Sequence, residues 1–198
     1  MRPADDAPRD GGPGTAPTSD DVTTWAVKAQ CGDPLAEAAF VRSTQEDVWR
    51  FCASQVDQGA ADDLTQETYL RAFRALPGFE ARASARTWLL GIARRTCADH
   101  LRTVIRRRRL DDVLRARAAA LSGRVDPVGG DPAGASNAVD LLARLPADRR
   151  AAFVLTQLVG LSYQEAAAVE NIPVGTVRSR VARAREDLVA QLARAAAS

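Results

Sequence analysis

The sequence LSYQEAAAVENIPVGTVRSRVARAREDL, residues 161–188, decides the fold of the C-terminal part of the chain. Ser162 and Glu165 fit the S-x-x-E capping box, which predicts the start of a short helix. Asn171 suits a turn with a left-handed backbone, and Pro173 opens a second, longer and basic helix. A short helix, a tight turn and a longer helix together form a helix-turn-helix motif.

The second helix of this motif has two chemically different sides. At about 100° per residue, one side is apolar and is predicted to be buried: Val177, Val181, Ala184 and Leu188. The opposite side and its flanks are polar and basic: Arg178, Ser179, Arg180, Ala182, Arg183 and Arg185. Such a surface can enter a major groove, where arginine reads guanine, and the amides at the start of the helix can hold a phosphate. A solvated arginine-rich helix is the ordinary alternative, but the cap, turn and phase together predict DNA binding.

The rest of the chain is predicted to be all-α, because no stretch alternates apolar and polar residues between turn signals. In the N-terminal part we expect helices that begin after Asp20 or Asp21, at Pro34 with Asp33 as N-cap, near Ala61, and at Ala85 with Ser84 as N-cap. The second of these is expected to bury Leu35, Ala38, Val41, Val48, Phe51 and Cys52. In the C-terminal part helices are expected over 139–145, 147–159, 163–169 and 174–192.

Composition divides the chain into four regions. Residues 1–19, rich in Pro, Gly and Asp, are expected to form a disordered tail, followed by a small helical domain over 20–105. Residues 106–137 are predicted to be a flexible linker, and 138–198 a second small helical domain. The run RRRRLDDV at 106–113 either continues the fourth helix as a solvated extension or begins the linker.

Acidic and basic residues are segregated along the chain. Residues 53–70 contain four acidic residues and no basic ones: Asp57, Asp62, Asp63 and Glu67. Residues 94–109 carry seven arginines against Asp99 alone, and residues 173–185 carry four arginines and no acid. The segregation indicates two kinds of partner, one of them a polyanion.

Several classes of function are disfavoured by the composition. The cysteines Cys31, Cys52 and Cys97 have no CxxC spacing and His100 is the single histidine, so we expect neither a metal site nor a cofactor. A catalytic Ser-His-Asp or Cys-His device would depend on His100, so we do not expect an enzyme. The chain has no long apolar run and no export signal, which predicts a cytoplasmic protein without a membrane span.

Four segments resemble a known family. ADDLTQETYLRAFRALPGF (61–79) and SARTWLLGIARRTCADHLR (84–102) resemble conserved region 2 of the sigma factors of bacterial RNA polymerase. LPADRRAAFVLTQLVGLSYQEAAAV (145–169) and IPVGTVRSRVARAREDL (172–188) resemble their region 4. The order and spacing are similar to the extracytoplasmic function (ECF, group 4) branch, including its actinobacterial C-type members.

The resemblance implies roles for individual residues. Those matching the segment that docks on the β′ clamp of core polymerase are Asp62, Asp63, Gln66 and Glu67. Those matching the part that recognises and melts the −10 element are Phe79, Arg82, Ser84, Arg86, Trp88, Arg94, Arg95, Asp99 and Arg102. Those matching the −35-binding helix are Pro173, Gly175, Thr176, Arg178, Ser179, Arg180, Arg183 and Arg185.

The family's residue roles do not carry over unchanged at Trp88, at Ala182 and at the pair Glu170-Asn171. Trp88 shares a helical side with Ile92, so packing in the core is the favoured role over stacking on a base. Ala182 stands where related sequences often have a larger side chain, and Glu170-Asn171 replaces the more usual Leu-Gly.

The resemblance implies a sigma factor that is monomeric when free. It would bind core polymerase at the β′ clamp and β flap, direct initiation at promoter DNA, and be held by an anti-sigma protein. Two alternatives stay open on the residues alone. One is a stand-alone helix-turn-helix regulator that binds palindromic duplex sites, with the first domain as sensor or dimerisation domain. The other is a helical adaptor without DNA-binding activity.

Overall fold

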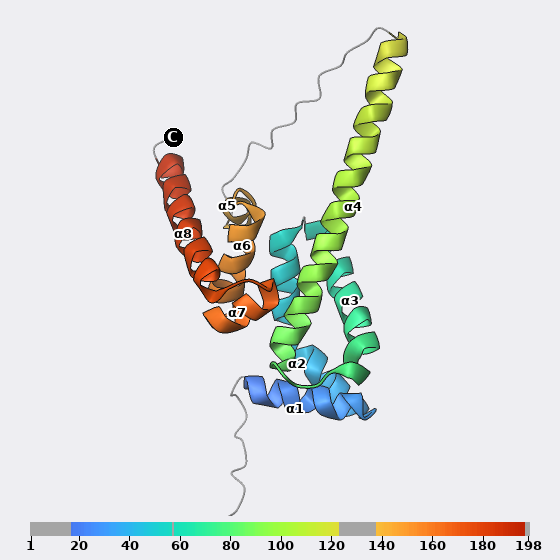
Figure 1. The fold of residues 1–198 in the computed structure, drawn as a ribbon, viewed down its shortest axis with the longest axis vertical. Coiled ribbons are helices and arrows are strands. Elements are labelled where there is room, and N and C mark those ends of the chain that lie inside the picture. The colour runs from blue at the N-terminus through green and yellow to red at the C-terminus, as the bar shows by residue number, and fades with distance from the viewer. Residues whose placement is uncertain (1–16, 57, 123–137, 197–198) are drawn as a thin grey trace, which may run out of the picture.

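A computed structural model describes residues 17–56, 58–122 and 138–196, and every regular element in these ranges is helical (Figure 1). The all-α prediction is therefore confirmed. The predicted disordered tail, apart from its last residues, and the Gly/Pro-rich centre of the predicted linker lie outside the described residues.

The N-terminal domain consists of four helices and one short 3₁₀ turn: α1 (Ser19–Gln30), α2 (Pro34–Gln55), α3 (Gln58–Ala75), η1 (Leu76–Gly78) and α4 (Ala85–Ser122). Asp33 accepts hydrogen bonds from the amides of Leu35 and Ala36, which confirms the N-cap predicted for α2. The start predicted for α1 was wrong. The helix begins at Ser19 with Thr18 as its N-cap, and Asp21 occupies the N3 position of the capping box. Asp21 therefore lies inside the first turn and completes the capping box by accepting from the Thr18 amide.

The core of this domain lies where α2 meets α3 and α4. Phe40, Val48, Phe51, Leu89 and Leu90 are almost completely buried there. In Figure 1, α1 lies across one end of these helices, and α1 and α2 make the most extensive helix–helix contact of the structure.

Two parts of the predicted core on α2 differ from the structure. Leu35 was predicted to be buried but is 79% exposed, because at about 100° per residue it lies on the side of α2 opposite the buried Phe40 and Thr44. Ala38 and Val41 are only half-buried, whereas Phe40 and Thr44, which were not predicted, are buried. Helix α2 therefore faces its neighbours through a side rotated from the predicted one.

Helix α4 does not end at residue 105, the predicted end of the first domain, but continues to Ser122. Residues 106–122, assigned from composition to the linker, are thus helical, and the solvated extension is the correct alternative for RRRRLDDV. Residues 92–122 contain neither Gly nor Pro and are rich in Arg, Leu and Ala, which have high helix propensity. In Figure 1 the second half of α4 projects well beyond the other helices.

The C-terminal domain consists of α5 (Ala138–Ala143), α6 (Ala147–Phe153), the π-helical turn η2 (Val154–Leu158), α7 (Tyr163–Glu170) and α8 (Val174–Ala196). The predicted capping box is confirmed: Ser162 Oγ accepts from the Glu165 amide at 3.2 Å, and Glu165 Oε2 accepts from the Ser162 amide at 2.9 Å. Asn171 has φ 53° and ψ 49°, the left-handed conformation predicted for the turn. Helices α7 and α8 thus form the helix-turn-helix motif.

The two domains pack against each other. Helix α4 contacts α7, and α2 contacts α6. Buried residues of both domains form one continuous apolar cluster, which includes Phe51 and Leu90 from the first domain and Val154 and Val169 from the second. The two described domains are therefore in direct contact, a point on which the predicted linker was silent.

We expect Asn171→Ala to lower the free energy of unfolding by about 1 kcal/mol, because a Cβ without a compensating polar group disfavours φ near +53°. Asn171→Gly is the matched control and should leave stability unchanged or slightly higher, since glycine adopts this conformation freely. Urea denaturation of both variants measures the difference. Equal stability of the two would show that the left-handed turn carries no strain.

Candidate functional site

The basic side of α8 is exposed as predicted. Val177, Val181 and Ala184 are buried against the rest of the C-terminal domain, which confirms the apolar side of the helix, and Leu188 is half-buried. The exposed residues of the opposite side are the polar Arg178, Ser179 and Arg183, together with Ala182. The Arg178 guanidinium lies 5.8 Å from the ring centroid of Tyr163, a cation–π contact that the sequence analysis missed.

Two arginines that flank the basic side of α8 form ion pairs or hydrogen bonds within the protein. Arg180 forms ion pairs with Asp148 at 3.3 Å and with Glu170 at 3.5 Å. Arg185 donates from Nη2 to Gln157 Oε1 at 2.7 Å. Both lie on the edges of the exposed basic surface, which leaves Arg178 and Arg183 as its central cations.

The start of α8 holds the three other residues predicted to meet DNA there. Pro173 and Gly175 are exposed and Thr176 is half-buried. The amide of Thr176 donates to the Pro173 carbonyl at 2.9 Å and is therefore already used within the first turn. A phosphate at this helix start would bind the earlier amides, including that of Gly175.

The acidic residues of α3 line a surface hollow. Asp62, Asp63 and Gln66 are exposed and share a hollow of about 590 Å³ with Tyr69 and Phe73. Burial raises the pKa of Tyr69 to about 12, so its hydroxyl stays protonated and hydrogen-bonds to Thr44 at 2.7 Å. The hollow thus combines two exposed carboxylates with two aromatic side chains.

Asp62 is held in place by a residue that the sequence analysis did not single out. The indole N–H of Trp49, on α2, donates to Asp62 Oδ1 at 2.7 Å, although Trp49 is itself 39% exposed. Only the packing of α2 beside α3 brings these residues together, so their spacing in the sequence carries no signal.

A chain of charges connects α3 to α4. Arg71 donates to Glu67 at 2.7 Å and to Asp99 at 2.9 Å, and Asp99 also accepts from Arg102 at 3.0 Å. Hydrogen bonds to Glu67 and then to Asp99 raise the pKa of Arg71. Glu67, a predicted polymerase-docking residue, and Asp99, a predicted −10-binding residue, therefore both bind the guanidinium of Arg71.

A second hollow, of about 300 Å³, lies beside the loop that precedes α4. Phe79, Arg82, Trp88 and Arg95 contribute to its walls. Ala81, also in the wall, has φ 52°, a left-handed conformation that is costly for alanine. The hollow and the strained loop bring four predicted −10 residues together.

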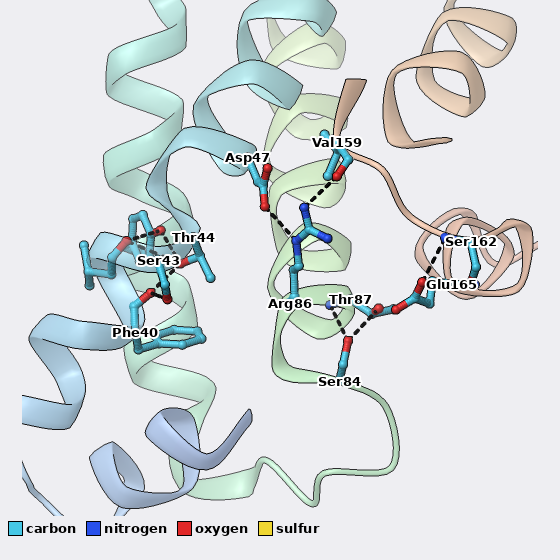
Figure 2. Close-up of polar contacts among 12 residues, drawn as sticks. Phe40, Ser43, Thr44, Asp47, Ser84, Arg86, Thr87, Val159, Ser162 and Glu165 are labelled. Atoms are coloured by element: carbon cyan, nitrogen blue, oxygen red, sulfur yellow. Dashed lines mark hydrogen bonds and ion pairs between the residues drawn. The ribbon is translucent and has the colours of Figure 1, made fainter. Parts of the chain in front are cut away.

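The aromatic rings of this hollow are packed rather than free. Phe79 is only 7% exposed, and its ring centroid lies 4.9 Å from that of the half-buried Trp88. Ser84 accepts a hydrogen bond from the Thr87 amide at 3.2 Å, so it acts as the predicted N-cap of α4 (Figure 2). Phe79 and Trp88 thus form the inner wall, and Ser84 serves the helix start.

Two predicted −10 residues contact the C-terminal domain. Figure 2 shows the Arg86 guanidinium between Asp47 of α2 and the carbonyl of Val159, at 2.7 Å and 2.6 Å. Arg94 Nε pairs with Glu170 Oε1 at 2.9 Å, and this carboxylate is 4% exposed. Both arginine side chains stay partly exposed, so the domain contact engages their guanidiniums without burying them.

The remaining reactive side chains form no site. Cys97 and Cys52 are buried with their sulfur atoms 3.6 Å apart, and Cys31 is exposed. Within the described ranges no cluster of His, Cys, Asp and Glu side chains could bind a metal ion. In the same ranges no helix combines the length and apolarity needed to span a bilayer.

Models of known protein families match both domains of the chain. The model described as "Sigma-70 region 2" matches residues 40–109, and "Sigma-70, region 4" matches residues 137–188. The chain is 51% identical over 183 residues to a protein of Mycobacterium bovis named "Probable RNA polymerase sigma-C factor", covering 89% of this chain and 95% of that protein. The chain belongs to the ECF sigma factors. It is also 35% identical over 172 residues to the ECF RNA polymerase sigma-E factor of Escherichia coli K12, covering 80% of this chain and 87% of that protein.

Solved ECF relatives have the same fold. CnrH, in complex with the cytosolic domain of CnrY, superimposes with a TM-score of 0.66 at 28% identity, over 87% of this sigma factor and 97% of CnrH. The sigma factor RpoE of Bartonella quintana, in complex with the anti-sigma factor NepR, gives 0.57 at 28% identity, over 77% and 93%. Region 2 of this chain thus corresponds to the N-terminal domain, and region 4 to the C-terminal one.

We expect Glu170→Gln to loosen the contact between the two domains, because it leaves Arg94 and Arg180 without their shared carboxylate. The loss should be about 1–3 kcal/mol of interdomain contact energy, since the carboxylate is buried but both arginines are partly exposed. Small-angle X-ray scattering should record a larger radius of gyration. Glu186→Gln, on the exposed side of α8, is the matched control, and equal scattering from both variants would contradict the expectation.

Proposed function

We propose that this ECF sigma factor binds core RNA polymerase, recognises the −35 and −10 elements of its promoters and helps to melt the −10 DNA. The observation that carries the proposal is the separation of surfaces: a hollow with exposed carboxylates on α3, and exposed arginines on α4 and α8. The chain supplies recognition, and the chemistry of RNA synthesis belongs to the polymerase.

Docking on the β′ clamp is assigned to Asp62, Asp63, Gln66 and Glu67. Asp62 and Asp63 are exposed, and Trp49 orients the first of them. Preoriented carboxylates bind a basic surface with less loss of side-chain freedom, which favours affinity. Region 4 is assigned to the β flap.

Capture of an unstacked −10 base is assigned to the hollow beside the loop 79–84. Its volume of about 300 Å³ has the size of a small ligand site, and Arg95 places positive charge at its wall, whereas Arg82 is paired there with Glu80 at 2.6 Å. Stacking on an aromatic ring contributes about 1–3 kcal/mol per base. Because Phe79 and Trp88 are largely packed against each other, a base gains little stacking here, so the factor should require promoters that match closely at both elements.

Arg86 and Arg94 become fully accessible to −10 DNA when the two domains separate. Both guanidiniums are engaged across the domain contact, with the Val159 carbonyl and with Glu170. Separation also lets region 4 reach the −35 element while region 2 holds the −10 element. We therefore assign these two arginines to the DNA-bound state.

The factor is further proposed to be a cytoplasmic monomer when free, held by an anti-sigma protein. The sigma factor RpoE of Bartonella quintana is solved in complex with the anti-sigma factor NepR, and this similar structure supports the proposal. No enzymatic activity and no cofactor are proposed for the chain itself.

The deciding experiment adds the purified protein to sigma-free core RNA polymerase with a pool of GC-rich promoter fragments and sequences the transcripts. Discrete start sites that share upstream −35 and −10 sequences are the expected result. A protein that ignores core polymerase but shifts palindromic duplex DNA by itself would instead be a stand-alone regulator. A protein that does neither would be an adaptor.

We expect Asp62→Arg combined with Asp63→Arg to lower the affinity for core polymerase at least tenfold, because both exposed carboxylates become like charges to a basic clamp. Asp20→Arg combined with Glu37→Arg, at exposed positions on α1 and α2, is the charge-matched control. Fluorescence anisotropy of labelled sigma factor with core polymerase measures both. Equal affinities of the two double variants would remove α3 from the docking surface.

We expect Arg178→Ala or Arg183→Ala to cost about 1–3 kcal/mol at one base step of the −35 element, because an exposed arginine on this helix can read a guanine. Transcription from a library of −35 substitutions measures the change. Specificity should relax at one position and be kept elsewhere. Equal weakening on every sequence would assign the side chain to a phosphate.

A further inference from the structure

The second half of α4 is a basic arm, defined here as residues 105–117. It carries six arginines against two aspartates, and every one of its residues is exposed. In Figure 1 this part of α4 stands clear of the other helices. The arm is thus a charged surface without a packing role among the described residues.

The arginines of the arm continue a line that begins in region 2. At about 100° per residue, Arg95, Arg102, Arg106 and Arg109 fall within about 60° of one another around α4. Arg107 and Arg108 point to other sides of the helix. Because α4 is one continuous helix from Ala85 to Ser122, the line is straight and its orientation to the −10 hollow is fixed.

The line has no anionic partner in its outer half. Arg102 pairs with Asp99 and Arg115 with Asp112, but no described residue forms an ion pair with Arg106 or Arg109. These two lie three residues apart and repel each other, and arginine cannot relieve the repulsion by losing its proton. A row of phosphates relieves it and releases counterions.

We propose that Arg106 and Arg109 bind the phosphate backbone of promoter duplex DNA upstream of the −10 element. The proposal rests on the function proposed above, in which α4 faces the −10 DNA. The arm leads along the chain toward region 4 and the −35 element, so it lies on the upstream side. At about 1.5 Å per helical residue and 3.4 Å per base pair, the two arginines meet phosphates about two to three base pairs beyond those that Arg102 reaches.

The arm also provides its own matched control. Arg106→Gln with Arg109→Gln removes the line, whereas Arg107→Gln with Arg108→Gln removes the same charge from the other sides of the same helix. Glutamine keeps the helix propensity of arginine, and circular dichroism checks that both variants stay folded. Each variant is assembled with core polymerase, and its affinity for a promoter fragment is measured against salt concentration.

The line variant should lower the slope of log affinity against log salt by about two, since each lost phosphate contact removes about 0.9. The control should change it by less than half as much. Methylphosphonates placed two to three base pairs upstream of the −10 element should abolish the difference between wild type and line variant. Equal slopes for the two variants would overturn the proposal.

Three further outcomes distinguish failure of the arm proposal from failure of the sigma-factor function on which it rests. Loss of affinity for core polymerase in the line variant, with an unchanged salt slope on DNA, would assign the arm to a protein partner and overturn the DNA contact. Failure of the wild-type chain to bind core polymerase or start transcripts would overturn the proposed function itself. A wild type that initiates normally while both variants behave alike would overturn the arm alone.

Discussion

One buried carboxylate holds the arrangement of the two domains. Glu170 ends α7, is 4% exposed, and accepts from Arg94 of region 2 and Arg180 of region 4. A carboxylate removed from water to this degree is stable only with such partners. Because α7 starts the helix-turn-helix and α4 carries the proposed −10 residues, this interaction couples the positions of both proposed DNA-binding surfaces.

The same contact explains why two of the proposed −10 residues are engaged within the protein while others are exposed. Arg86 and Arg94 point into the domain boundary, whereas Arg82, Arg95 and Arg102 face solvent. The acidic surface of α3 lies outside the contact and stays free. The closed arrangement is therefore compatible with docking on a basic protein surface, but it restricts what region 2 can offer to DNA.

Helix α4 connects several of the proposed functional surfaces. Its start frames the hollow beside Ala81, its middle contacts α7, and its end is the exposed basic arm. Arg71 links it to α3, the helix proposed to dock on core polymerase, through Asp99 and Glu67. A rigid helix fixes the relative positions of these surfaces more strictly than a flexible connection would.

The sequence by itself determined the helix-turn-helix, with its capping box at Ser162, its left-handed Asn171 and the buried side of α8, because these depend on local backbone preferences and helical period. It also determined the family, which short motifs in a fixed order identify. Only the tertiary structure decided that Trp49 orients Asp62, that Arg71 bridges two helices and that Glu170 takes an arginine from each domain. These contacts join residues far apart in the chain, and no local preference encodes such a distance. The end of α4 at Ser122 lies between the two cases: helix propensity favoured the extension, but composition led us to assign it to the linker.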